Sequence, residues 1–227
     1  MNTWLERIEA LTYSLWDGLQ ISFIQMILLT IAICTFSYWL LERQKKSFFI
    51  ACIALLGFVI LRSIAVVLAL EQKRIIVYNV PKKQAIDIVD GTRNLFIGDS
   101  VLKRDDFSRN FYLKPARIMY RTYGNDLATT GENFPNAFLY AGKTILMIDT
   151  AFSPLESADK PVVDLLVLSK NPKLYLSSLA RHFTIRQVVA DGSVPAWKSK
   201  YWKKDCDSLH IPIHDVTEDG AFVMNLR

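Results

Sequence analysis

The pattern of hydrophobic positions changes sharply near residue 70. Residues 21–41 carry no charged side chain, and residues 48–70 form a second apolar run that only Arg62 interrupts. At a rise of about 1.5 Å per residue, a helix of either length can cross a hydrocarbon core of roughly 30 Å. A linker of only six residues joins the runs, which makes two buried core helices a poor alternative. The pattern predicts two transmembrane helices within residues 21–73.

Residues 1–20 have a different apolar pattern. Trp4 and Trp16 belong to a set of apolar positions at helical spacing, and charged residues such as Glu6 and Glu9 fall on the other face. This spacing predicts an amphipathic helix that lies along a membrane surface. Packing against a protein partner explains the pattern equally well. The acidic flank and the lack of a small-residue cleavage site argue against a signal peptide.

From residue 74 the hydrophobic period becomes that of strands. Strands are predicted at 75–78, 85–89, 94–98, 137–140 and 144–148. Asp90-Gly91 and residues 141–143 have the composition of hairpin turns. Between these hairpins, residues 101–121 have helical character.

The last third of the chain alternates strands and helices. A continuous apolar strand is predicted at 162–168, in which Asp164 is the only charged residue, and a short strand is predicted at 187–190. Helices are predicted at 174–183 and 195–209, the second with Ser193 as its N-cap. Strands at 211–216 and 221–225 end the chain. Hairpins followed by this alternation predict that residues 74–227 form one layered α/β domain.

Composition and charge add few restrictions. The chain has a net charge of +5, and residues 74–227 account for about +4 of it, with 21 basic against 17 acidic residues. This mild excess permits weak attraction to nucleic acid or anionic lipid but requires neither. Cys206 is the only cysteine beyond residue 73, which excludes a disulfide within that domain.

Charges around the apolar runs predict an orientation. Residues 42–46 of the linker include three basic residues, and the positive-inside rule places the linker in the cytoplasm. The domain at 74–227 is then periplasmic, on the outer side of the inner membrane. Basic residues at 73, 74, 82 and 83 oppose this orientation. Insertion of an arginine such as Arg62 at the centre of a membrane costs roughly 2.5–3.5 kcal/mol of free energy. Arg62 therefore either reaches a local partner or faces other helices or a polar pathway.

A basic segment follows Pro195. Lys198, Lys200, Lys203 and Lys204 alternate there with Trp197, Tyr201 and Trp202. Lysines beside aromatic rings can hold a phosphate backbone and stack bases. An ordinary amphipathic surface helix with Trp202, Cys206 and Leu209 toward the core has the same pattern. Both interpretations stay open on the sequence.

Three segments carry a resemblance to a known family. They are Val163-Asp164-Leu165-Leu166-Val167-Leu168-Ser169, Ala190-Asp191-Gly192-Ser193-Val194-Pro195 and His214 to Phe222. The chain resembles the C-terminal part of ComEC-type competence proteins, the inner-membrane channels for DNA uptake, in their Bacteroidetes-like form. The resemblance implies two transmembrane helices followed by a reduced metallo-β-lactamase-like layered α/β domain.

The same comparison implies a lost metal site. Active members carry a His-x-His-x-Asp-His cluster that binds one or two metal ions. This chain has Lys170-Asn171-Pro172-Lys173 after the strand where those histidines stand, and Asn79 to Lys83 where many members have Asp-Val-Gly-x-Gly. Its three histidines, His182, His210 and His214, form no such cluster, and Pro212 prevents the last two from sharing a helix. We therefore expect no cofactor, no metal ligands and no metal-dependent hydrolase activity. Asp99 could mimic a loop carboxylate of the family or be a turn residue.

The resemblance also suggests where DNA would bind. It places Lys170 and Lys173 at the mouth of the former active site, and with Lys198, Lys200, Lys203 and Lys204 they are the expected DNA contacts. Two helices cannot form a DNA channel, so we expect further ComEC-like transmembrane helices from the same or an adjacent gene as partners. A membrane-bound hydrolase with a non-standard site and a membrane scaffold unrelated to DNA are the alternatives.

Overall fold

The computed structural model describes residues 20–104, 106–122, 136–149 and 160–226. Its backbone divides into two compact units. The first comprises Met1–Leu70 with Ile118–Arg121, and the second comprises Glu71–Arg117 with Thr122–Arg227. The predicted surface helix in residues 1–20 lies outside the described residues, apart from Gln20.

The first unit contains a helical hairpin of α2 (Phe23–Glu42) and α3 (Lys45–Leu70), which confirms both predicted helices. A capping box begins α2: the Gln25 backbone N–H donates to Ser22 Oγ at 3.3 Å, and the Ser22 N–H donates to Gln25 Oε1 at 3.1 Å. Gln25, the polar residue of the apolar run, therefore satisfies the backbone at the helix start. Arg43 ends α2 in the left-handed conformation, with φ of 50°.

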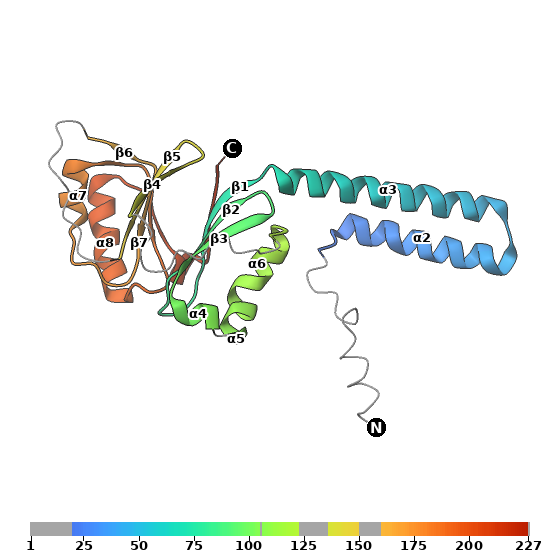
Figure 1. Ribbon diagram of the computed structural model, residues 1–227, viewed down its shortest axis with the longest axis horizontal. Coiled ribbons are helices and arrows are strands. Elements are labelled where there is room, and N and C mark those ends of the chain that lie inside the picture. The colour runs from blue at the N-terminus through green and yellow to red at the C-terminus, as the bar shows by residue number, and fades with distance from the viewer. Residues whose placement is uncertain (1–19, 105, 123–135, 150–159, 227) are drawn as a thin grey trace, which may run out of the picture. The chain divides into compact units, whose positions relative to one another are not determined.

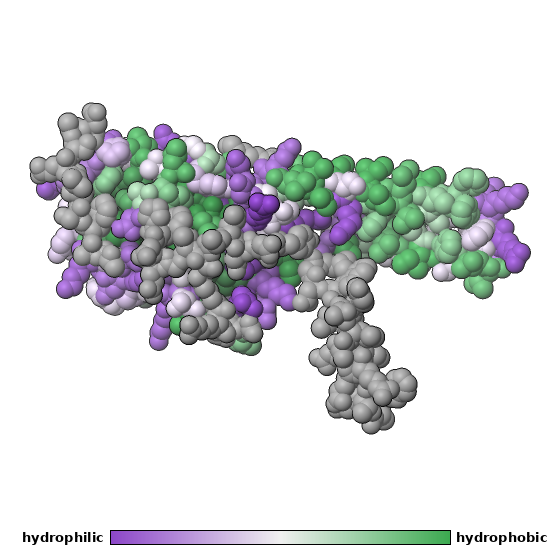
Figure 2. All heavy atoms as spheres, viewed as in Figure 1, coloured by the Kyte–Doolittle hydropathy of each residue, from purple (hydrophilic) through white to green (hydrophobic). Residues whose placement is uncertain are grey.

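The surfaces of α2 and α3 are apolar and largely uncovered. Only 11% of the apolar window of each helix is buried, and by length and composition both helices could cross a membrane. Figure 2 shows hydrophobic residues along both helices and hydrophilic residues at their turn. The helices approach each other through small side chains, among them Ala32, Ala51 and Ala54. Arg62 is half-buried, and its Nη1 donates to the carbonyl of Gln20 at 3.4 Å, which favours a local partner.

The second unit begins with an antiparallel sheet. Its strands are β1 (Lys73–Val77), β2 (Ala85–Asp90), β3 (Arg93–Gly98) and β11 (Phe222–Asn225), in the order β11-β1-β2-β3. The β2–β3 hairpin closes at Gly91, with φ of 60°, as Asp90-Gly91 predicted. The last strand of the chain thus pairs with the first strand of the unit.

A five-stranded sheet contains most of the remaining strands. These are β4 (Ala137–Tyr140), β5 (Lys143–Ile148), β7 (Leu165–Leu168), β9 (Val188–Ala190) and β10 (Ile213–Asp215), in the order β10-β9-β7-β5-β4. All neighbours are parallel except the β4–β5 hairpin. A separate pair joins β6 (Val162–Val163) to β8 (Thr184–Ile185).

Alternating side chains of the five-stranded sheet supply two cores. Leu146, Leu166 and Val188 face one core, which they share with α7 (Leu176–His182) and with Trp202 and Cys206 of α8 (Ala196–Leu209). Their neighbours in sequence, such as Ile145 and Leu165, face the antiparallel sheet. Figure 1 shows α7 and α8 on one side of the five-stranded sheet. The fold is therefore a mixed, layered α/β domain that follows two long apolar helices, as predicted.

A buried ion pair lies on the remaining face of the antiparallel sheet. The segment after β3 forms α4 (Ser100–Arg104), α5 (Asp106–Ser108), the π-helical turn η1 (Arg109–Leu113) and α6 (Lys114–Met119). Arg117 of α6 donates two hydrogen bonds to Asp87 of β2, at 2.9 and 3.0 Å. Tyr78 and Asn94 also donate to this carboxylate, and burial raises the pKa of Tyr78. The fully buried charge of Asp87 is therefore paired and hydrogen-bonded.

Three local predictions were wrong. The strand expected at 162–168 is divided at Asp164, whose side chain accepts from the Thr144 N–H at 3.0 Å and pairs with Arg186. Ser193 is not the N-cap of α8, because that position is Pro195 and makes no side-chain cap bond. The strand expected at 211–216 ends at Asp215, whose side chain instead caps the short helix α9 (Val216–Asp219) by accepting from the Thr217 N–H at 2.9 Å.

Candidate nucleic-acid interface

Three parallel strands end side by side, and a charged residue follows each of them within two positions. Asp149 follows β5, Ser169 and Lys170 follow β7, and Asp191 follows β9. The order β9-β7-β5 makes these positions neighbours. In open α/β sheets, ligands bind outside the carboxyl ends of the strands. We call the side chains of Asp149, Ser169, Lys170 and Asp191 the strand-end cluster.

The segment before β2 closes one side of this cluster. The Lys82 N–H donates to the Gly192 carbonyl at 2.8 Å, and a Cβ on Gly192 would lie 2.3 Å from the Val80 carbonyl oxygen. Only glycine permits this approach. Gln84 Nε2 donates to Ser169 Oγ at 3.0 Å, and the Gln84 N–H donates to Asp99 Oδ2 at 3.0 Å. The fold thereby brings together three segments that the sequence singled out: 79–83, 170–173 and 191–193.

Lys170 is the basic residue of the strand-end cluster and pairs with one of its two acids. Its Nζ donates to Asp149 Oδ2 at 2.9 Å, and its backbone N–H donates to Ser193 Oγ. The Asp149 hydrogen bond raises the pKa of Lys170, and the negative charges of Asp149, Asp99 and Asp191 raise it further. Lys170 therefore keeps its positive charge at neutral pH, beside three carboxyl groups.

Asp191 is the buried acid of the cluster. Its Oδ1 accepts from the Ser193 N–H at 2.9 Å. Burial raises the pKa of Asp191 to about 6, although the Ser169 and Ser193 hydroxyls act in the opposite direction. Ser193 thus holds the loop after β9 together rather than beginning α8.

Within the described ranges, no group of three or more His, Cys, Asp or Glu side chains could hold a metal ion. His182 contacts the Ser178 carbonyl on α7, His210 ends α8, and His214 of β10 contacts the Gly220 carbonyl. His210 and His214 are thus a helix-end residue and a strand residue, as Pro212 indicated.

An exposed face of α8 carries aromatic and basic residues. Trp197 and Tyr201 are 66% and 55% exposed and stand one turn apart on the helix. Lys200 and Lys204 are exposed beside them. In the part of the chain that the structure describes, neither lysine forms an ion pair. We call Trp197, Lys200, Tyr201 and Lys204 the α8 surface.

The other predicted lysine contacts have different surroundings. Lys198 is buried, and its Nζ donates to Asn171 Oδ1 at 2.6 Å and to the Pro172 carbonyl. Burial lowers the pKa of Lys198, and the nearby charge of Lys173 lowers it further. Lys203 donates to Glu218 at 2.7 Å, and this hydrogen bond raises the pKa of Lys203. Lys173 is exposed. The structure thus separates Lys173, Lys200 and Lys204 from Lys170, Lys198 and Lys203, whose ammonium groups bond within the domain.

The sequence analysis did not name Asp149, and it named Ser169 and Asp191 only within the segments that carry the resemblance. All three residues directly follow an apolar strand, and this position is the signal that could have marked them as site residues. Asp99 accepts from the Gln84 N–H and acts on the charge state of Lys170, so it faces the cluster as well as preceding α4.

Comparison with known proteins gives one match. The family model of the ComEC C-terminal domain matches residues 75–226. No curated protein matches the chain, and no solved structure does.

Proposed function

Because the chain belongs to the family of the ComEC C-terminal domain, whose role is in competence and DNA uptake, we propose that it binds DNA at the inner membrane without hydrolysing it. The α8 surface carries this proposal, since it offers exposed positive charge beside exposed rings. Phosphates attract lysines, and bases stack on aromatic side chains. Trp197 and Tyr201 would stack bases, and Lys200, Lys204 and Lys173 would hold the backbone.

The strand-end cluster supports the absence of metal-dependent hydrolysis. A hydrolytic metal needs several imidazole or carboxylate ligands around an open position. Lys170 places an ammonium group at this edge instead, held by Asp149 at 2.9 Å. The order of the layers and the position of the site at the strand ends are consistent with a reduced metallo-β-lactamase-like domain. In such a domain the former metal site would now have a structural role. Lys170, Lys198 and Lys203 would act on DNA only weakly, because each ammonium group already has a partner.

The helical hairpin would anchor this domain. Two exposed apolar helices fit a bilayer, and the basic turn 43–46 fits the cytoplasmic side. The DNA-binding domain would then be periplasmic in a multi-pass assembly. Since two helices cannot enclose a strand, further ComEC-like transmembrane helices from the same or an adjacent gene would complete the channel.

Fluorescence anisotropy of labelled DNA with the full chain in detergent micelles tests the proposal. Affinity should fall linearly with salt on logarithmic axes, because phosphate contacts release counterions. Lys200→Glu with Lys204→Glu should lower affinity about tenfold or more and reduce the salt slope by about 1.5 to 2.

A matched control is the double reversal Lys73→Glu with Lys160→Glu. It changes net charge equally, and both lysines are exposed and lie outside α8. Equal effects of the two double variants would show that only net charge matters. No binding at low salt would favour a membrane scaffold, and metal-dependent cleavage would favour a hydrolase with a non-standard site.

A further inference from the structure

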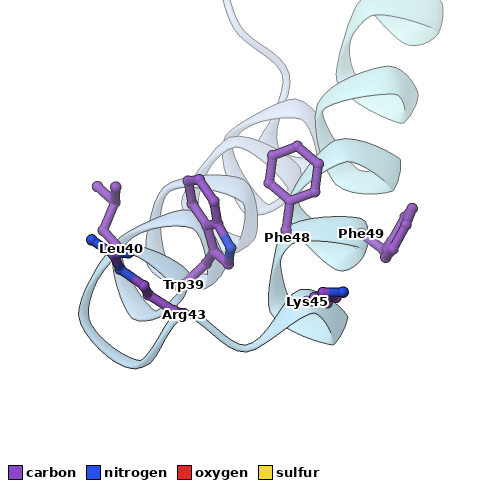
Figure 3. Close-up of a pocket in the computed structure, with 6 residues that line it drawn as sticks. All are labelled: Trp39, Leu40, Arg43, Lys45, Phe48 and Phe49. Carbon is purple, nitrogen blue, oxygen red and sulfur yellow. The ribbon is translucent and has the colours of Figure 1, made fainter.

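The turn of the helical hairpin contains a hollow that the DNA-binding proposal does not use. It measures about 590 Å³ and is lined by Trp39, Leu40, Arg43, Lys45, Phe48 and Phe49. The rings of Trp39 and Phe48 lie 4.9 Å apart between centroids. Figure 3 shows these rings side by side, with Arg43 and Leu40 on the α2 side and Lys45 and Phe49 on the α3 side. Two cationic side chains thus flank an aromatic pair.

A second hollow of about 410 Å³ lies between the same helices. Leu29, Ile33 and Phe36 of α2 and Phe48, Cys52 and Leu55 of α3 line it. Ala32 and Ala51 also line it and are buried between the helices. Phe48 belongs to both hollows, so the apolar groove adjoins the basic one.

This arrangement matches the two ends of a phospholipid. An acyl chain needs an apolar groove, and an anionic headgroup needs cations at the membrane–water boundary, where tryptophan is also favoured. Glu42, the last residue of α2, does not line either hollow, whereas Arg43 and Lys45 line the first. Across the described ranges, neither cation forms an ion pair that would compete with a phosphate. Both volumes lie within the range of ordinary ligand sites.

We propose that the hairpin turn binds one anionic phospholipid, with its phosphate between Arg43 and Lys45 and an acyl chain in the groove beside Phe48. The inference rests on membrane insertion of the hairpin, which is part of the proposed function. It adds a specific lipid site to that anchor. The expected ligand is phosphatidylglycerol or another lipid with a net negative headgroup.

Native mass spectrometry of the full chain in a mild non-ionic detergent tests the site. The wild type should retain phosphatidylglycerol about fivefold or more over phosphatidylcholine. Lys45→Gln should lower this preference about fivefold, since one basic residue near a membrane surface contributes about that factor. The matched control is Lys46→Gln, because Lys46 is the next residue in the same turn but does not line the hollow. It should change the preference less than twofold.

Two further measurements distinguish binding of the acyl chain from binding of the headgroup. Cys52→Phe should reduce retention of both lipids and leave their ratio unchanged, because the new ring fills the apolar groove. Inorganic phosphate should not displace the lipid, whereas a site for free phosphate would release it.

Equal retention of the two lipids, or equal effects of Lys45→Gln and Lys46→Gln, would overturn the lipid site and leave the membrane anchor intact. A protein helix that occupies the apolar groove in place of lipid would also overturn the lipid site. A full chain that stays soluble without detergent would instead contradict membrane insertion itself.

Discussion

The strand-end cluster and the α8 surface use lysine in opposite ways. At the cluster, Lys170 is held by Asp149 and faces two further carboxyl groups. On the α8 surface, Lys200 and Lys204 are exposed, and no ion pair joins them to other described residues. A lysine that balances charge inside the domain contributes to stability, whereas an exposed lysine without a partner is available to a ligand. The presence of lysine in the sequence does not by itself distinguish these two roles.

The largest expected effect concerns charge that is balanced inside the domain. Arg117→Met leaves the buried carboxylate of Asp87 without its bidentate partner. The free energy of unfolding should fall by about 3 kcal/mol, measured by denaturant titration of the full chain in detergent, with DNA affinity unchanged among folded molecules. The control is Arg186→Met, whose guanidinium pairs with Asp164 but is 61% exposed. That change should cost less than about 1 kcal/mol. Equal losses would contradict the role of burial.

The second effect is a pH dependence from Asp191. Burial raises its pKa to about 6 in the folded domain. The folded state therefore binds this proton more tightly than the unfolded state, and stability falls as pH rises from about 4 to 6. Asp191→Asn removes the titration, so the variant should gain about 2 kcal/mol relative to wild type across this interval.

Asp164→Asn provides a comparison of opposite sign. Burial opposes ionisation of Asp164, but hydrogen bonds from Thr144 and Lys143 hold its pKa below the ordinary value. The stability that Asp164 contributes is thus present at neutral pH and is lost as pH falls, and Asp164→Asn should lose it. A stability difference for Asp191→Asn that does not change with pH would refute the assignment.

The third effect is a loss of DNA binding when the exposed rings of the α8 surface are removed. Trp197→Ala with Tyr201→Ala should weaken binding of single-stranded DNA about thirtyfold by anisotropy, because each ring can stack a base at about 1 kcal/mol or more. Stability should change by no more than about 0.5 kcal/mol. Phe107→Ala with Phe111→Ala is the matched control, since these two exposed rings also stand one turn apart but lie on another segment. A similar loss of DNA affinity in that control would show that the rings of α8 have no specific role in binding.

The smallest effect concerns Lys170 itself. Lys170→Met should lower stability by about 1 kcal/mol, because the Asp149 pair is partly exposed. A double-mutant cycle with Asp149→Asn should recover a coupling of similar size. DNA affinity should change less for Lys170→Met than for Lys173→Met. A larger loss of DNA affinity for Lys170→Met than for Lys173→Met would show that Lys170 contacts DNA.

Much of the fold follows from local patterns. Alternation with Val and Ile located β1, β2 and β3, and Asp90-Gly91 located their hairpin turn, because both signals act within a few residues. Two long apolar runs located α2 and α3. The break at Asp164 was not predictable in this way, since it depends on bonds to Lys143, Thr144 and Arg186 of other segments.

The candidate site was predictable only in part. Helical spacing placed Trp202 and Cys206 in the core, but it did not show that Lys198 is buried against Asn171 or that Lys203 reaches Glu218. These bonds join residues 15 or more positions apart. Asp149 and Asp191 meet because of the strand order β9-β7-β5, which no local pattern specifies.

The central claim is that this domain binds DNA and does not cut it through a metal. The most direct test incubates the full chain with end-labelled DNA under three conditions: with zinc, with manganese, and with a chelator. We predict salt-sensitive binding that is equal in all three and DNA that stays full length. Cleavage that the chelator stops, together with metal retained in a fixed ratio to protein, would contradict the account.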